Sequence, residues 1–370
     1  MAQILFLSLF LLVIFGSHFF IFKSISFFIG IFGVYRLWFA AVLIALPLLF
    51  VISSVLAHYF FNYFFRAFYF ISGLWLALAL NLIVALTAIW ILFGLSKYFN
   101  LNIDFKILGW IGIICSVLFV LYGIWHAYDL KIKNITVGIK DLPEEWYGKK
   151  AVQISDVHLG YVYGKDYLQS LVDKVNRLNP DIVFITGDLL DGMDGHLEEL
   201  VAPLNGLHPV WGTYFVTGNH ETYLGVDKAF NALSKTNVKI LNDKLEFING
   251  MQLVGLSFPS GEIRESRDFS LVLPSLGFTS SKPSILLYHA PMGVEKAKGA
   301  GVNLFLAGHT HVGQLFPLGF ITKIIYAGYD YGFHQDGDFS IYTSSGAGTW
   351  GPTARTSKDS EITLINFESK

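Results

Sequence analysis

Hydrophobic residues follow two different patterns along the chain, and the first of them occupies residues 1–128. Charged residues interrupt this region so rarely that it contains four long uncharged stretches. These stretches are residues 4–22, 37–61, 67–96 and 107–128. A helix of about 20 apolar residues can cross about 30 Å of hydrocarbon. We therefore predict a transmembrane domain over residues 1–130 with four helices.

The first stretch could instead be a cleaved signal peptide. It lacks a basic segment at its start and a small-residue cleavage site, and three further apolar stretches follow it. We therefore expect it to remain as a membrane anchor.

The second pattern begins after residue 130, where short β-rich runs alternate with helical stretches and turns. The runs predicted as buried strands are Ala151–Ile154, Ile182–Ile185, Tyr214–Val216, Ile285–Tyr288 and Leu304–Leu306. Between the first two, apolar residues recur at helical spacing from Tyr167 to Leu178. Strands alternating with helices are typical of an α/β domain, which we place at residues 131–370.

Composition supports this division and limits the function. The chain is 53% hydrophobic with a mean hydropathy of +0.52, which is too apolar for an ordinary soluble protein. Its net charge of −2 provides no basic surface of the kind that nucleic-acid binding requires, so we expect no nucleic-acid partner. The single cysteine, Cys115, excludes an intrachain disulfide and a cysteine zinc cluster.

Candidate chemistry lies directly after the predicted strands, where open α/β sheets usually place their sites. The segments are Asp156–His158, Gly187–Asp188, Gly218–Glu221, His289 and Gly308–His311. Each segment alone could be an ordinary turn. Together they bring Asp, Asn or His to five consecutive strand ends. Oxygen and imidazole ligands without thiolates favour manganese, iron or zinc over soft metals and over calcium.

These five motifs, in this order, resemble those of the calcineurin-like metallophosphoesterases, and the resemblance covers about residues 132–367. The approach Leu142–Ser155 is similar to bacterial membrane-associated members. The glycine-rich segment Tyr342–Gly351 is longer than the family pattern. The resemblance implies an α/β fold, a two-sheet sandwich flanked by helices, with two divalent metal ions at its top. We expect manganese, with iron, zinc or magnesium as alternatives.

The resemblance also implies a role for each motif residue. One metal would be held by Asp156, His158, Asp188 and His311, and the other by Asp188, Asn219, His289 and His309. Asp188 would bridge the two cations. The residues implied to act in catalysis are His220, Asp188 and Asn219.

Two cations at such a site lower the pKa of a shared water and hold the oxygens of an in-line displacement, so hydrolysis would be direct. His220, beside Asn219, would stabilise the phosphoryl charge or protonate the leaving oxygen. The alternative for His220 is a structural hydrogen bond. Asp191 either orients the site or caps a helix.

These expectations predict a membrane-anchored phosphoesterase that cleaves a phosphoester or pyrophosphate bond, acting on a phosphorylated lipid or lipid-linked substrate. The alternative is a membrane sensor or interaction protein that binds metal without turnover. The apolar segment Leu315–Tyr326 beside the last motif bears on the substrate. It is either a buried strand or hairpin, or a lip that lies on lipid with Lys323 at the headgroups.

Four spans place the N-terminus and the α/β domain on one side of the membrane. Basic residues near the spans are almost balanced between the sides. Lys140, Lys149 and Lys150 at the start of the domain add positive charge to its side. We therefore expect an integral protein of the bacterial plasma (inner) membrane with a cytoplasmic catalytic domain.

Overall fold

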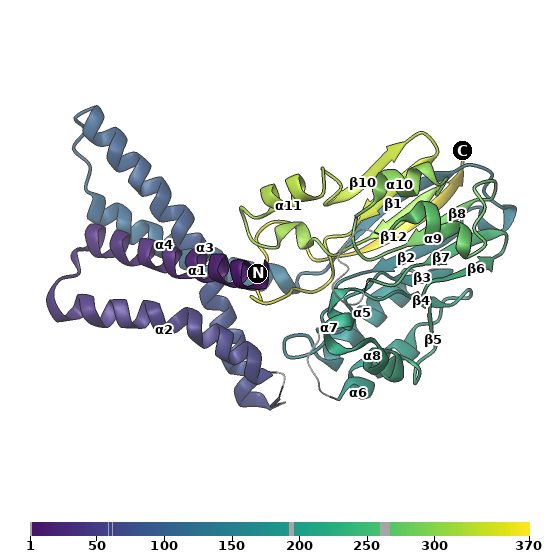
Figure 1. Ribbon diagram of the computed structural model, residues 1–370, viewed down its shortest axis with the longest axis horizontal. Helices are drawn as coiled ribbons and strands as arrows, with labels where there is room; N and C mark the ends of the chain where they lie inside the picture. Colours follow the sequence, from purple (N-terminus) through teal and green to yellow (C-terminus); the bar gives the residue numbers. More distant parts are fainter. Residues whose placement is uncertain (1, 58, 61, 192–195, 260–266) are drawn as a thin grey trace. The chain divides into compact units, whose positions relative to one another are not determined.

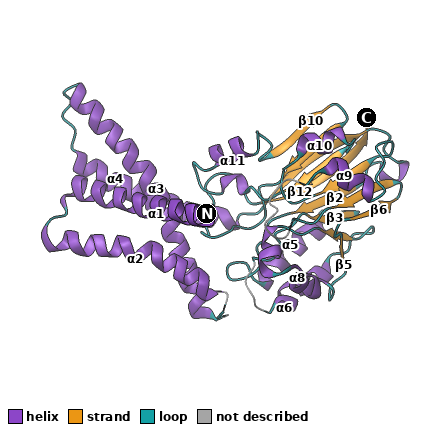
Figure 2. Cartoon of the chain, in the orientation of Figure 1, coloured by secondary structure: helices purple, strands orange, loops and turns teal. Residues whose placement is uncertain are grey.

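The computed structural model describes residues 2–57, 59–60, 62–191, 196–259 and 267–370. The chain divides into two compact units (Figures 1 and 2). The helical unit comprises Met1–Trp125 together with Gly351–Thr356, and the sandwich unit comprises His126–Trp350 together with Ser357–Lys370.

The helical unit contains long apolar helices. They are α1 (Ala2–Ile25), continued by the π-helix η1 (Ser26–Gly30), α2 (Gly33–Ala57), α3 (Tyr63–Tyr98) and α4 (Phe105–Tyr128). Ile21, Leu43 and Leu86 belong to its interior, whereas many large apolar side chains face outward. Four helices in the described residues are long and apolar enough to cross a membrane, so the prediction of four apolar helices is confirmed.

A short segment from the far end of the sequence belongs to the helical unit. The backbone N–H of Arg355 donates to the carbonyl of Gly123 in α4 over 2.9 Å. A Cβ atom on Gly73 of α3 would lie 3.4 Å from the carbonyl oxygen of Gly351. Small residues on α3 and α4 therefore allow Gly351–Thr356 to approach the helices closely.

The sandwich unit consists of two six-stranded sheets in the described residues. The first sheet has the order β1 (Lys131–Ile139), β12 (Glu361–Ser369), β2 (Lys150–Ile154), β3 (Ile182–Ile185), β4 (Thr213–Phe215), β5 (Val238–Ile240). The second has the order β10 (Gly332–Asp336), β11 (Phe339–Thr343), β9 (Leu304–Ala307), β8 (Ser284–Leu287), β7 (Met251–Gly255), β6 (Lys244–Ile248). The predicted two-sheet α/β sandwich is confirmed.

Helices and short turns complete this unit. The helices are α5 (Lys165–Arg177), α6 (Leu197–Val201), α7 (Asn219–Leu224), α8 (Val226–Leu233), α9 (Phe269–Ser275), α10 (Val294–Gly299) and α11 (Gly319–Ile325). The 3-10 turns are η2 (Glu144–Trp146), η3 (Ala202–Gly206) and η4 (His311–Gly313).

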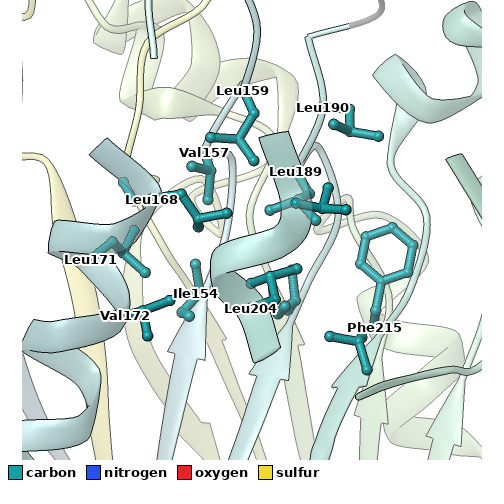
Figure 3. Close-up of a cluster of buried hydrophobic side chains, with 14 of the residues drawn as sticks. Ile154, Val157, Leu159, Leu168, Leu171, Val172, Leu189, Leu190, Leu204 and Phe215 are labelled. Carbon is teal, nitrogen blue, oxygen red and sulfur yellow. The ribbon is translucent and has the colours of Figure 1, made fainter. Parts of the chain in front are cut away.

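Alternation along β2 shows how the sequence builds two cores at once. Val152 and Ile154 belong to the cluster that packs under the helices, and Ala151, which directly precedes Val152, belongs to the core between the two sheets. Successive strand residues point to opposite faces, so a strand covered on both sides is apolar throughout. Figure 3 shows the helix-side cluster, with Leu168 and Leu171 of α5 beside Ile154. The predicted helix at Tyr167–Leu178 is confirmed as α5.

Leu171→Ala should lower the free energy of unfolding by about 2 to 5 kcal/mol, because it leaves a cavity at a side chain that is only 1% exposed. Chemical denaturation of the solubilised chain, followed by near-UV circular dichroism, measures this. The matched control is Leu271→Ala in α9, where the side chain is 71% exposed and a change within about 0.5 kcal/mol is expected. Equal losses in the two variants would contradict the core assignment.

Candidate metal centre

The site is built where parallel strands of both sheets end. β2, β3 and β4 run parallel in the first sheet, and β8 and β9 run parallel in the second. The residues that follow these strands meet at one edge of the sandwich. All eight predicted site residues come together there: Asp156, His158, Asp188, Asn219, His220, His289, His309 and His311.

The first cluster consists of Asp156, His158 and His311, whose ligand atoms lie close enough to hold one cation. The Nε2 atoms of His158 and His311 are 3.0 Å apart, and His311 Nε2 is 3.4 Å from Asp156 Oδ1. All three residues are buried. Two imidazole nitrogens and a carboxylate that converge in this way match the donor set of a divalent metal site.

The second cluster consists of Asp188, His289 and His309. His289 Nε2 lies 3.1 Å from Asp188 Oδ2, 3.2 Å from His309 Nδ1 and 3.2 Å from Asn219 Oδ1. The Nδ1 of His289 is 2.8 Å from the carbonyl oxygen of Thr186, which fixes the ring. With Nδ1–H donating to this carbonyl, Nε2 is left to face the cluster.

Asp188 connects the two clusters. Its Oδ2 atom is also 4.0 Å from His158 Nε2 in the first cluster, and its Oδ1 atom accepts from the backbone N–H of His220. The carboxylate therefore faces both groups of ligands. This position fits a cation on either side of Asp188.

Burial and neighbouring charge shift the pKa values of the site. Burial alone would raise the pKa of Asp188, but the adjacent His289 charge and hydrogen bond hold that pKa well below its ordinary value. Burial would likewise lower the pKa of His289, yet Asp188 raises it to about 10. Burial and the charge of His289 lower the pKa of His309 to about 3. The Asp188 carboxylate thus attracts positive charge, which a metal bound by neutral imidazoles would supply.

The backbone of the ligand loops is strained. Asp156, His158, Asp188, His309 and His311 all have φ between +47° and +74°. Side chains other than glycine rarely adopt this left-handed region, and such residues cluster at functional sites. The fold therefore holds these five residues in a conformation that local propensity alone would not select.

Glycine is required at two positions because carboxylates of the site lie very close to the backbone there. A Cβ atom on Gly218 would lie 2.1 Å from Asp188 Oδ1, and one on Gly308 would lie 2.2 Å from Asp156 Oδ2. Any side chain at either position would displace a carboxylate. These contacts explain the glycines that precede Asn219 and His309 in the motifs.

Glu221 organises the loops, a role that the sequence did not reveal although Glu221 ends the third motif. Its carboxylate accepts the backbone N–H groups of Asp188, Leu190 and Gly218 over 2.7 to 3.0 Å. Burial, followed by repulsion from Asp188, raises the pKa of Glu221 to about 7. The available signal in the sequence was a glutamate three residues after Gly218, the spacing of a helix capping box.

His220 and Asp191 lie against the first cluster. The ring of His220 is 4.6 Å from that of His158, and Asp191 Oδ1 is 3.2 Å from His158 Nδ1 and 3.5 Å from His220 Nδ1. Asp191 therefore contacts the site, as expected if it orients the ligands. The pKa of His220 is lowered, and burial is the largest cause.

Residues Gly319–Ile325 of the apolar segment form α11, and none of the residues of this fully described helix is buried. Its interpretation as a buried strand or hairpin is therefore wrong. Tyr326, which directly follows α11, has its ring 6.1 Å from that of His309. An exposed apolar helix thus ends beside a predicted metal ligand.

A two-sheet sandwich with clustered aspartates and histidines at its strand ends defines a metal-dependent phosphoesterase. A family model, calcineurin-like phosphoesterase, matches residues 149–313. The chain belongs to the calcineurin-like metallophosphoesterase family.

Relatives with this domain occur in bacteria and animals. The chain is 34% identical to an uncharacterised metallophosphoesterase of Campylobacter jejuni over 70% of this chain and 69% of the relative. It is 30% identical to a transmembrane protein with metallophosphoesterase domain of Danio rerio over 69% of this chain, and spans 61% of that relative. A dimetal phosphatase structure from Danio rerio covers 54% of this chain and 88% of its own, at 14% identity and a TM-score of 0.33.

Asp188→Asn should lose bound metal and phosphoesterase activity together, because the carboxylate that faces both clusters loses its charge. Metal content by mass spectrometry and turnover of bis-nitrophenyl phosphate measure the two effects. Asp181→Asn, directly before β3, is the matched control, since Asp181 pairs with Lys149 away from the site and should keep both properties. Full metal occupancy with normal turnover in Asp188→Asn would remove Asp188 from the centre.

Proposed function

We propose that this chain is a membrane-anchored, binuclear phosphoesterase that hydrolyses a phosphoester or pyrophosphate bond of a lipid or lipid-linked substrate. The observation that carries the lipid assignment is α11, an exposed apolar helix that ends at the ring of His309 in a chain with four membrane-type helices.

The donor set supports two divalent cations, with manganese preferred. Asp156, His158, Asp188 and His311 would hold one, and Asp188, Asn219, His289 and His309 the other. When bound, the cations supply an activated water and neutralise charge on the phosphate. Asp191 holds the His158 ring through Nδ1, and the Thr186 carbonyl does the same for His289, so that each ring keeps its Nε2 toward the centre.

His220 would act on the substrate itself. Its ring lies at the edge of the first cluster, and its backbone N–H is fixed by Asp188. A neutral His220, favoured by its lowered pKa, takes up a proton from solvent only when negative charge develops beside it, and it returns to the neutral form when that proton passes to the leaving oxygen. We assign it to stabilise the phosphoryl charge and to deliver a proton to the leaving oxygen.

The surface around α11 fits an acyl chain. Phe316, Phe320 and Ile324 are exposed, and the rings of Phe316 and Phe320 are 6.2 Å apart. Each such side chain gains about 1.5 to 3 kcal/mol when it leaves water. Because the membrane helices keep lipid at high local concentration, the occupant we assign to this surface is lipid, with Lys323 at the headgroup level.

We further propose that the helical unit spans a bacterial inner membrane and that the sandwich unit lies on its cytoplasmic side. Basic residues at the start of the sandwich unit, Lys149 and Lys150 among them, support this orientation. Cysteine-accessibility labelling of intact cells at an introduced Lys150→Cys position tests it, since a cytoplasmic site stays protected from an impermeant reagent.

His220→Ala should keep both metals yet lose turnover by about 100-fold or more, the range for one acid or charge-stabilising donor. Metal content and kcat for bis-nitrophenyl phosphate are measured on the same preparation. His208→Ala, at an exposed position, is the control and should match the wild type. Loss of metal in His220→Ala would instead assign His220 a structural role.

The double variant Phe316→Ser with Phe320→Ser should weaken hydrolysis of a long-chain phospholipid at least tenfold relative to a nitrophenyl phosphodiester. The apolar side chains contribute affinity only when the substrate carries an acyl chain.

Phe247→Ser is the matched control, because Phe247 is 54% exposed on β6. Phe247→Ser should change hydrolysis of the two substrates equally and only slightly. Equal losses on both substrates in the double variant would count against a lipid-binding role for α11.

A further inference from the structure

Trp350 is an exposed aromatic residue held at the edge of the metal centre. Its side chain is 57% exposed, although the residues before it, from Phe339 to Thr349, are buried. Its ring is 5.9 Å from the ring of His220, at 77° to it. Tyr223 lies on the same histidine at 5.4 Å and is also exposed. His220 is thus bordered by two aromatic rings that solvent can reach.

The segment that carries Trp350 is fixed to the site. The N–H of Ala347 donates to the carbonyl of Ser155 over 2.8 Å, and that of Gly348 donates to the carbonyl of Asp156 over 2.7 Å. A Cβ atom on Gly346 would lie 2.8 Å from that of Asp156. The glycine-rich segment Tyr342–Gly351 therefore packs directly on the loop that carries Asp156, and Trp350 follows at the end of this contact.

Gln314 fastens Trp350 through its backbone. The side chain of Gln314 donates from Nε2 to the Trp350 carbonyl over 3.0 Å and accepts at Oε1 from the Trp350 N–H over 2.9 Å. The Gln314 carbonyl also accepts from the N–H of Ser357. Gln314 thus joins both points at which the chain leaves and re-enters the sandwich unit, with Gly351–Thr356 between them. It stands three residues after His311 and has a left-handed φ of +55°.

We propose that Trp350 is a specificity-determining residue that contacts the leaving group of the phosphoester and favours a leaving group with a flat ring, and that Gln314 positions it. This inference rests on the proposed function, in which His220 lies against the leaving group of the bound substrate. A ring beside His220 then lies beside the leaving group. A flat apolar face packs on an indole ring, whereas a short alkyl group covers little of it.

The experiment uses the full-length solubilised chain with benzyl and ethyl phosphate, each as a monoester and as its methyl diester. Both leaving groups are primary alcohols, so they differ mainly in the ring. Release of benzyl alcohol or ethanol gives kcat and KM for each. Metal content is measured on every variant.

Trp350→Ala should lower kcat/KM for the benzyl ester about tenfold, mainly through KM, and change the ethyl ester less than about twofold. Trp350→Phe should retain most of the preference. Gln314→Ala should reproduce the selective loss at unchanged metal content. Combining Gln314→Ala with Trp350→Ala should cause no further loss of the preference for the benzyl ester, because the two residues act as one unit.

Tyr147→Ala is the matched control, since Tyr147 is 53% exposed and precedes β2 at the opposite end from the site. It should leave the preference unchanged. Equal losses on both esters in Trp350→Ala would overturn the inference and leave the proposed function intact. Absence of turnover of all four esters by the wild type would contradict the proposed function, and the inference with it.

Discussion

The Asp188 carboxylate, buried between two groups of imidazoles, is the constraint on which the rest of the site depends. A buried charge is costly unless it is paired. Here the pairing is built from both sheets: His289 follows β8 of the second, while the N–H of His220 follows β4 of the first. The two sheets must therefore keep their strand ends together for the charge to be compensated. In the binuclear centre that we propose, a divalent cation on each side of Asp188 would complete that compensation.

Strain in the loops follows from the same constraint. Side chains from five strand ends converge only if the backbone turns sharply after each strand, and the left-handed φ values of Asp156, His158 and Asp188 accomplish this. Glu221 holds two of the turns by accepting three N–H groups. Gly218 and Gly308 remove the side chains that would collide with the carboxylates. These contacts hold the ligand side chains in position, and such preorganisation favours catalysis.

Much of this architecture could be predicted from the sequence, because strands covered on both sides leave continuous apolar runs. β3 at Ile182–Ile185 and the polar Gly187–Asp188 after it are an example. The bridging of one carboxylate between two metals came from the family resemblance and stays a proposal. The position of Glu221 was visible in a motif, but its bonds to the N–H groups of Asp188 and Leu190 were not, since they join loops that are far apart in sequence.

Other features lay beyond sequence reasoning because they depend on tertiary contacts. The segment Leu315–Tyr326 is apolar enough for either a core strand or a surface helix, and only its packing decides between them. The inclusion of Gly351–Thr356 in the helical unit depends on close approach to Gly73 and Gly123. Trp350 likewise has no sequence motif, and its position follows from the Gln314 hydrogen bonds.

We propose that these strand ends form a two-cation hydrolytic centre. The most direct measurement is the metal content of the purified full-length chain, titrated with Mn²⁺ after chelation, with hydrolysis of bis-nitrophenyl phosphate followed at each step. We predict that turnover is absent after chelation and rises to its maximum as about two ions bind per chain. Saturation at one ion, or turnover that survives complete removal of metal, would contradict it.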